Sequence, residues 1–137
     1  MHLEYNIQGG DFSNAGTASS AIKKVLKQIM SNQKIIRRVV VALYEAEVNI
    51  VAHAFSGKIS VDIDVNKIEI FVKDKGPGIS DIEKAMENGY STASDEVREM
   101  GFGAGMGLAN IKNNTSEFEI KSELGVGTEL FIKVDLK

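Results

Sequence analysis

The chain has 137 residues, the usual length of one domain, and it contains no cysteine. The lack of cysteine excludes a disulfide scaffold, a Cys-ligated zinc site, an iron–sulfur cluster and a thiol nucleophile. The 16 Lys and Arg residues against 19 Asp and Glu residues give a net charge of −3, which argues against a general binder of nucleic acid or of anionic membranes.

The first third of the chain predicts one strand and two helices. Apolar and polar residues alternate over Leu3–Gln8, which is typical of a strand with one buried face. The first helix is indicated by apolar residues that recur every three or four positions: Ala15, Ala18, Ile22, Val25 and Ile29. We expect Ser13 or Asn14 to cap it. A second helix is expected over about 33–55, and its apolar second half predicts that it is the most buried helix.

The rest of the chain predicts a sheet that helices cover on one side. Alternation predicts four more strands: residues 59–65, 68–72, 117–121 and 129–135. Short helices are expected to begin at Ser80 and to cover about 106–114. Strands with one apolar and one polar face belong to a sheet with one covered side. We therefore expect an α/β (α+β) two-layer sandwich, with a mixed, mainly antiparallel sheet and helices on one face.

A polar stripe crosses the apolar second helix. Glu45, Asn49 and His53 follow one another at intervals of four, so they lie along one face of the helix. Two interpretations stay open: a solvent-facing edge, or oxygen ligands for a hard cation such as Mg²⁺ together with a base. A zinc site is disfavoured, because the chain has no HExxH motif and its only other histidine is His2.

Two glycine-rich segments follow predicted strands or precede predicted helices. Asp74-Lys75-Gly76-Pro77-Gly78 comes directly after a strand, as a turn or as a carboxylate beside exposed backbone. Glycines at 101, 103, 105 and 107 lead into a helix, as a mobile loop or as a cradle for phosphate oxygens. A P-loop and a Rossmann unit are disfavoured, because GxxxxGK[ST] is absent and GxGxxG fails at Met106 and at Leu108. The long polar segment 88–100 is typical of a lid or of a binding loop.

Taken in order, these motifs resemble the GHKL superfamily with its Bergerat ATP-binding fold. The motifs are Glu45-x3-Asn49 on a helix, Asp74-x-Gly76-x-Gly78 after a strand, Gly103-x-Gly105-x-Gly107 before a helix, and Gly127-Thr128 before the last strand. The chain has room for one freestanding ATPase domain over residues 1–137. It most resembles the anti-sigma factors and serine/threonine kinases of bacterial partner-switching systems, which residues 116–123 and 125–128 also match.

The resemblance implies a role for each matching residue at the phosphate end. Glu45 would be the catalytic base, and Asn49 would bind Mg²⁺. The cradle for the phosphates would come from four residues: Gly103, Gly105, Met106 and Gly107. Residues of about 89–104 would form a lid over ATP, and Arg98 within it would approach a phosphate.

The resemblance also implies roles at the adenine end and near the site. Asp74 would accept a hydrogen bond from the adenine amino group, Gly76 and Gly78 would let the base approach, and Thr128 would support that end. Glu47, beside the stripe, departs from the family's pattern, and we expect it to put an extra carboxylate near the site or toward a partner.

The implied function is an ATP- and Mg²⁺-dependent protein serine/threonine kinase. Its substrate would be a small STAS-like anti-anti-sigma protein, and the chain would act as an anti-sigma or related switch, with a sigma factor as a second partner. The alternative is a nucleotide-gated binding module that sequesters a regulator with little or no kinase activity. A homodimer is expected, with 3–8 as one candidate edge for pairing, and no direct contact with nucleic acid or membrane. A cytoplasmic location is expected, because no apolar run approaches ~20 residues and the N-terminus lacks the features of a signal peptide.

Overall fold

The computed structural model describes residues 1–79 and 107–136. The first half contains strand β1 (His2–Gln8), a one-turn 3-10 helix (Phe12–Asn14), helices α1 (Thr17–Ile29) and α2 (Gln33–His53), and strands β2 (Ser56–Ile63) and β3 (Lys67–Lys75). Helix α5 (Gly107–Asn113) and strands β4 (Glu117–Glu123) and β5 (Gly127–Asp135) follow. The helix expected from Ser80 lies outside the described residues.

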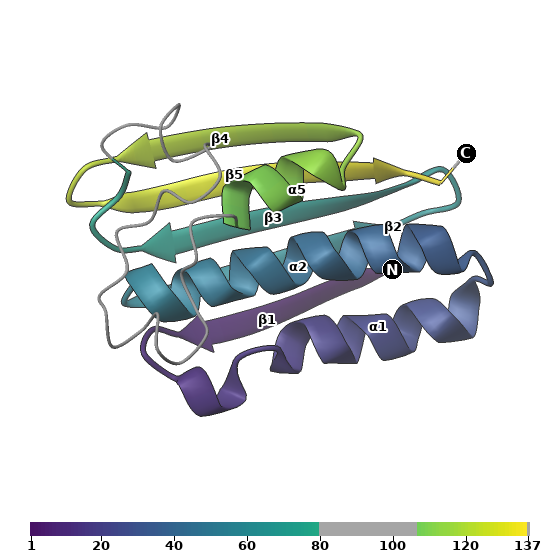
Figure 1. Ribbon diagram of the computed structural model, residues 1–137, viewed down its shortest axis with the longest axis horizontal. Helices are drawn as coiled ribbons and strands as arrows, with labels where there is room; N and C mark the ends of the chain where they lie inside the picture. The colour runs from purple at the N-terminus through teal and green to yellow at the C-terminus, as the bar shows by residue number, and fades with distance from the viewer. Residues whose placement is uncertain (80–106, 137) are drawn as a thin grey trace.

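Within the described residues, the strands form one antiparallel sheet in the order β1-β2-β3-β5-β4. Helices α1, α2 and α5 all lie on one face of it (Figure 1). The two-layer α/β fold predicted from the sequence is therefore confirmed, with strands in antiparallel pairs. No described helix is long and apolar enough to cross a membrane.

The core lies between the sheet and α2. Alternate residues of the central strands point to the helices and are fully buried, among them Ile59, Ile70 and Ile132. They pack in one cluster with α2 residues such as Leu43 and Ile50. Burying a side chain of this size contributes about 1.5–3 kcal/mol. This cluster holds α2 at a fixed height over the sheet, and with it the polar side chains that α2 carries.

Two details of the predicted elements are wrong. Helix α1 buries Leu26 completely and leaves Ile29 47% exposed, because Leu26 packs in the core cluster and Ile29 does not. Val65, expected inside a strand, is 77% exposed, because β2 ends at Ile63. A turn follows there, in which the Asp64 carboxylate accepts hydrogen bonds from the backbone N–H groups of Asn66 and Lys67.

Neither Ser13 nor Asn14 caps α1, because Glu47 of α2 takes that role. The Glu47 side chain is 1% exposed, and its two oxygens accept backbone N–H groups of Gly16 at 3.0 Å, Ala18 at 3.2 Å and Ser19 at 3.0 Å. The first N–H groups of a helix have no partner within it, and the helix dipole favours a negative charge there. Glu47 therefore fastens the beginning of α1 to α2, and the expectation that it faces the site or a partner is wrong.

Candidate functional site

The polar residues predicted for the site lie at one end of the sheet. Asp74 is the last residue but one of strand β3, α2 carries Glu45 and Asn49, α5 begins at Gly107, and β5 begins at Gly127, just before Thr128. Figure 1 shows the end of β3, the end of α2 and the beginning of α5 toward the left of the view. The contacts described below join α2 to the start of α5 and the end of β3 to the start of β5.

Helix α5 packs with its first residue directly on the polar stripe of α2. A Cβ atom at Gly107 would lie 3.0 Å from Asn49 Oδ1 and 3.3 Å from Glu45 Oε2. Asn110, one turn later, donates a hydrogen bond from Nδ2 to Glu45 Oε1 at 3.2 Å. Glu45 and Asn49 are half-buried. The stripe is therefore covered by α5 and is not a solvent-facing edge, and Asn110 fixes one carboxylate oxygen while the other points to Gly107.

Replacing Gly107 with alanine is expected to lower the free energy of unfolding by about 1–3 kcal/mol, because the added methyl group needs space that Asn49 and Glu45 occupy. Urea unfolding measures the change. Asn113→Ala, on an exposed position of the same helix, is the matched control and should stay within about 0.5 kcal/mol of the unsubstituted chain. A Gly107→Ala variant of unchanged stability would show that α5 does not rest on the stripe as described.

Asp74 lies at the other side of the site, where β3 meets the start of β5. Its Oδ1 accepts the Thr128 backbone N–H at 3.0 Å. Among the described residues, no donor reaches its other oxygen, Oδ2. Burial raises the pKa of Asp74, and the hydrogen bond from Thr128 opposes that rise. Gly127 makes the contact possible, because a Cβ atom there would lie 2.1 Å from the Asp74 carbonyl oxygen.

Ser122 on β4 ties this part of the site together. Its Oγ accepts the Ile79 backbone N–H at 2.7 Å and lies 3.0 Å from Thr128 Oγ1 and 3.2 Å from the Gly127 carbonyl oxygen. The hydroxyl therefore links the chain after β3 to the start of β5. Sequence reasoning missed both Ser122 and Asn110. A signal existed for Ser122, since it is the polar residue in the inward-facing series that begins with Phe118 and Ile120.

The glycines after Asp74 are explained by protein packing. A Cβ atom at Gly76 would lie 3.0 Å from Ala54 Cα, at the end of α2. Gly78 has φ +76°, and a Cβ atom there would lie 2.5 Å from the Glu123 carbonyl oxygen. Glycine avoids both contacts and adopts the left-handed conformation without strain. A role of these glycines in the approach of an adenine base stays a prediction.

The last residue of the stripe, His53, lies at the end of α2, near Gly76. His53 ends α2 and is half-buried, and burial lowers its pKa. Several predicted site residues lie outside the described part of the chain: Gly103, Gly105, Met106, Arg98 and the lid of about 89–104.

The side-chain oxygen atoms of Glu45 and Asn49 suit a hard cation that keeps most of its water ligands when it binds to a protein. Among residues 1–79 and 107–136, no group of three or more His, Cys, Asp or Glu side chains could hold a metal ion. Mg²⁺ differs from zinc in this respect, because it commonly takes one or two protein oxygens and completes its shell with water and phosphate. Asn49 Oδ1, next to Glu45 Oε2 and the open position of Gly107, offers such an oxygen.

Known proteins are similar to this chain in sequence and in fold. Residues 11–133 match the family described as the histidine kinase-like ATPase domain. The chain is 35% identical over 97 residues to the serine/threonine-protein kinase RsbT of Bacillus subtilis, covering 68% of this chain and 67% of RsbT. It is 30% identical over 142 aligned positions to an anti-sigma F factor of Halalkalibacterium halodurans, covering 99% of this chain and 92% of that protein.

A solved structure adds a likeness of fold alone. A chain in the crystal structure of the SiaB–SiaC complex from Pseudomonas aeruginosa aligns with a TM-score of 0.59 over 98% of this chain and 89% of that chain, at 11% identity. The names of the relatives agree with the two classes that the motifs predicted, serine/threonine kinases and anti-sigma factors. Because the matching region includes every described residue of the site, from Glu45 to Thr128, the chain belongs to the histidine kinase-like ATPase family.

Proposed function

We propose that this chain is an ATP-dependent kinase that phosphorylates a serine or threonine of a small STAS-like anti-anti-sigma protein and thereby acts as an anti-sigma switch. The observation that carries the proposal is the meeting of Glu45 Oε2 and Asn49 Oδ1 against Gly107, at the sheet end that also holds Asp74. The likeness to a serine/threonine-protein kinase and to anti-sigma F factors supports both parts of it.

The adenine end of the site is formed by Asp74 and its neighbours. Asp74 Oδ2 has no donor among the described residues, so it can accept a hydrogen bond from the exocyclic amino group of adenine. Thr128 holds the other oxygen through its backbone N–H, and Ser122 holds Thr128 in turn. A half-buried carboxylate without a second donor is costly, and a bound amino group would relieve that cost. These contacts select a base with a donor at that position, as in adenine.

The phosphate end is formed by α2 and the start of α5. Asn49 would supply one oxygen to Mg²⁺, and backbone N–H groups would hold phosphate oxygens. The residues proposed for the second task are Gly103, Gly105, Met106 and Gly107. When bound, Mg²⁺-ATP supplies the transferable phosphoryl group. The chain has a net charge of −3, so the negative charge of ATP must be balanced by these local dipoles and by the cation.

Glu45 is the group proposed to take the proton from the attacking hydroxyl of the partner protein. Asn110 donates to Oε1 and thereby fixes the carboxylate plane, which leaves Oε2 directed at the start of α5. A general base must reach the hydroxyl within about 2.6–3.2 Å in the productive complex. Most of the remaining rate enhancement in phosphoryl transfer comes from positioning and charge stabilisation.

Replacing Asp74 with asparagine is expected to weaken ADP binding about 10- to 100-fold. Asparagine has one acceptor oxygen, so its amide nitrogen must face either the Thr128 N–H or the adenine amino group, and one hydrogen bond to a charged group is lost. Isothermal titration calorimetry measures the affinity. Asp62→Asn, the same chemical change on β2, is the matched control and should bind ADP normally. Equal affinities of Asp74→Asn and the unsubstituted chain would remove Asp74 from the adenine site.

The kinase proposal is tested by phosphoryl transfer to the partner. The chain is incubated with Mg²⁺, γ-labelled ATP and each STAS-like protein of the same organism, and labelled residues are identified by mass spectrometry. Label on one serine or threonine of one such protein is the expected result. Absence of transfer to every candidate, from a chain that binds ATP, would refute the kinase activity.

A second candidate function, a nucleotide-gated binding module, is favoured by the anti-sigma F factors among the relatives. In that case the chain would hold a sigma factor in one nucleotide state and release it in another. Its affinity for candidate sigma factors is measured with ATP, with ADP and without nucleotide. Equal affinities in all three conditions would exclude the switch, because a ligand shifts only states that it binds differently.

We also propose that the chain forms a homodimer and works in the cytoplasm. A sigma-type partner acts on transcription inside the cell, which supports that location.

A further inference from the structure

Helix α5 is held on α2 at both of its ends. It has seven residues, and a helix this short is not stable in water by itself. Its first residue, Gly107, rests on Glu45 and Asn49 of α2. The residue that follows its last one, Asn114, lies at Arg38, nearer the beginning of α2, so the two helices run antiparallel to each other (Figure 1). How α5 lies on the candidate base Glu45 therefore depends on both ends.

Arg38 fastens the second end. It precedes Glu45 by about two helical turns, so both side chains project from the same face of α2. Arg38 is half-buried, and its Nε donates a hydrogen bond to the Asn114 carbonyl oxygen at 3.2 Å. Among the described residues it forms no ion pair with a carboxylate. Its positive charge is thus placed at the C-terminal end of α5, where the helix dipole favours a cation.

A continuous series of hydrogen bonds leads from Arg38 to the candidate base. The Asn114 side chain donates from Nδ2 to the Asn110 carbonyl oxygen at 2.8 Å, one turn back along α5. Asn110 in turn donates from its own Nδ2 to Glu45 Oε1 at 3.2 Å. All three donor side chains are half-buried. The series begins and ends on one face of α2, so α5 cannot slide along α2 without breaking a hydrogen bond at each end.

The neighbouring arginine, Arg37, has different surroundings. It projects about 100° further round α2, where it is exposed, and within the described part of the chain its side chain has no hydrogen bond or ion pair. The guanidinium group of Arg38 carries its charge and its Nε–H in a fixed planar geometry, and a hydrogen bond from a charged donor is stronger than a neutral one. Of the two adjacent arginines, Arg38 is therefore the one whose charge holds another helix.

We propose that Arg38 is a positioning residue for Glu45, on which it acts from the opposite end of α5. The inference rests on the proposed role of Glu45 as the general base. Arg38 holds the end of α5, and Asn114 passes this restraint back by one turn. Asn110 then keeps the Glu45 carboxylate plane fixed, with Oε2 directed at the start of α5. A simple cap of α5 would leave the side-chain amide of Asn110 unchanged, so the two roles can be separated by experiment.

The first test needs neither nucleotide nor partner. The side-chain amide signals of ¹⁵N-labelled Asn110 are recorded by NMR in the unsubstituted chain and in Glu45→Ala, which lacks the acceptor and gives the position of the unbonded amide. In Arg38→Ala and in Asn114→Ala the signals should move toward that position. Asn114→Ala keeps the backbone carbonyl that Arg38 contacts, so it breaks the series at a second place even where Arg38→Ala fails to fold. Arg37→Ala is the matched control and should leave the signals unchanged.

The second test measures single-turnover transfer of phosphate to the partner protein. Arg38→Ala should slow transfer about two- to tenfold, the effect of losing one hydrogen bond of ordinary strength, and Asn110→Ala should slow it by a similar factor. The variant with both substitutions should stay within about twofold of the slower single variant, because both act on Glu45 through one series of contacts. Arg37→Ala should transfer at the full rate.

Two results would overturn the proposal. One is an Asn110 signal that stays unchanged in both Arg38→Ala and Asn114→Ala. The other is a pair of rate effects that multiply in the double variant, since independent residues behave in that way. If the unsubstituted chain transfers no phosphate, the kinase proposal fails, and the NMR comparison alone decides whether Arg38 positions Glu45.

Discussion

Replacing Glu45 with glutamine is expected to slow phosphoryl transfer to the partner about 10²- to 10⁴-fold, the usual contribution of a general base. Glutamine has nearly the same shape and can still accept the hydrogen bond from Asn110, so α5 should keep its place on α2. It cannot take a proton from the partner's hydroxyl. ADP affinity should therefore change less than about threefold. Single-turnover transfer from labelled ATP and calorimetric titration with ADP measure the two quantities.

Asn110→Ala is the matched control for this prediction. It leaves the Glu45 carboxylate in place and removes only the donor that orients it, so transfer should fall less than with Glu45→Gln. A Glu45→Gln variant that transfers phosphate at the full rate would remove Glu45 from the chemistry. A variant that also loses ADP would show instead that Glu45 supports the nucleotide site as a structural residue.

Replacing Glu47 with alanine is expected to lower the free energy of unfolding by about 2–4 kcal/mol. The substitution removes the acceptor of three backbone N–H groups at the beginning of α1, in a place that water does not reach. Loss of a helix cap costs about 0.5–2 kcal/mol, and a buried donor left without a partner costs about 1–3 kcal/mol. Glu47→Gln keeps one acceptor oxygen and should lose about half as much. Urea unfolding at pH 7 measures all three chains.

The pair Glu45 and Glu47 provides its own control, because both are glutamates on α2. Glu45→Gln should change the free energy of unfolding by less than about 1 kcal/mol and slow transfer as stated above. Glu47→Gln should lower the free energy of unfolding and leave the rate of phosphoryl transfer unchanged, when transfer is assayed at a temperature where this variant stays folded. A loss of less than about 1 kcal/mol in Glu47→Ala would contradict the role of this carboxylate at the start of α1.

Most of the fold is predictable because apolar residues recur every second position in the strands and every three or four positions in the helices. Residues such as Ile68, Ile70 and Val72 alternate with polar ones, and only a strand lays them on one side. The phase of α1 could not be predicted, because Leu26 and Ile29 are equally apolar. Which of them is buried depends on the surface that α2 presents.

The residues of the site were predictable where a polar side chain stands in an apolar helix. They were less predictable where the role of a residue depends on contacts with distant segments. A carboxylate and an amide four positions apart in an apolar helix indicated Glu45 and Asn49, and the structure lays α5 against both. Glu47 could have been placed correctly, because two positions in an α-helix correspond to about 200° and thus to the opposite side from Glu45. Asn110 and Ser122 act through contacts with distant segments, so their roles follow from the packing of α5 and from the pairing of β4 with β5.

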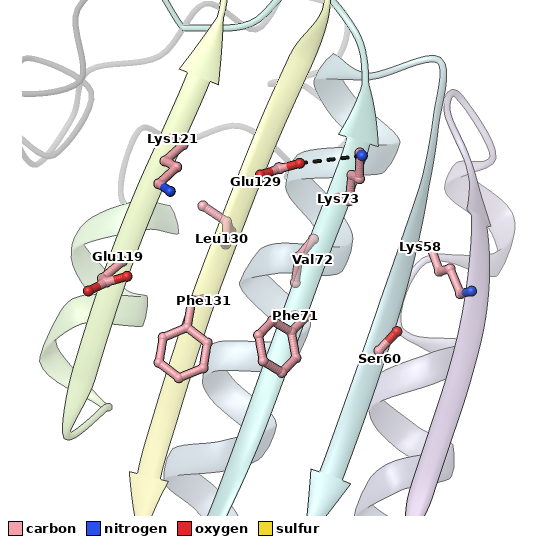
Figure 2. A pocket seen from close by; sticks show the side chains of 10 residues that line it. All are labelled: Lys58, Ser60, Phe71, Val72, Lys73, Glu119, Lys121, Glu129, Leu130 and Phe131. Carbon is pink, nitrogen blue, oxygen red and sulfur yellow. Dashed lines mark ion pairs between the residues drawn. The ribbon is translucent and has the colours of Figure 1, made fainter.

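We propose that ATP binds on the helix side of the sheet end, between Asp74 and the Glu45–Asn49 stripe. A hollow of about 430 Å³, lined by Phe71, Phe131 and several lysines, lies on the opposite face of the sheet (Figure 2). A ligand bound there would therefore shift other residues than a ligand bound at the sheet end. The most direct measurement is a titration of the ¹⁵N-labelled chain with Mg²⁺ and a non-hydrolysable ATP analogue, followed by NMR. We predict the largest amide shifts at Gly76, Gly107 and Thr128, with Phe71 and Phe131 unchanged. Shifts confined to Phe71, Phe131 and the lysines of the outer face would show that ATP does not bind at the sheet end.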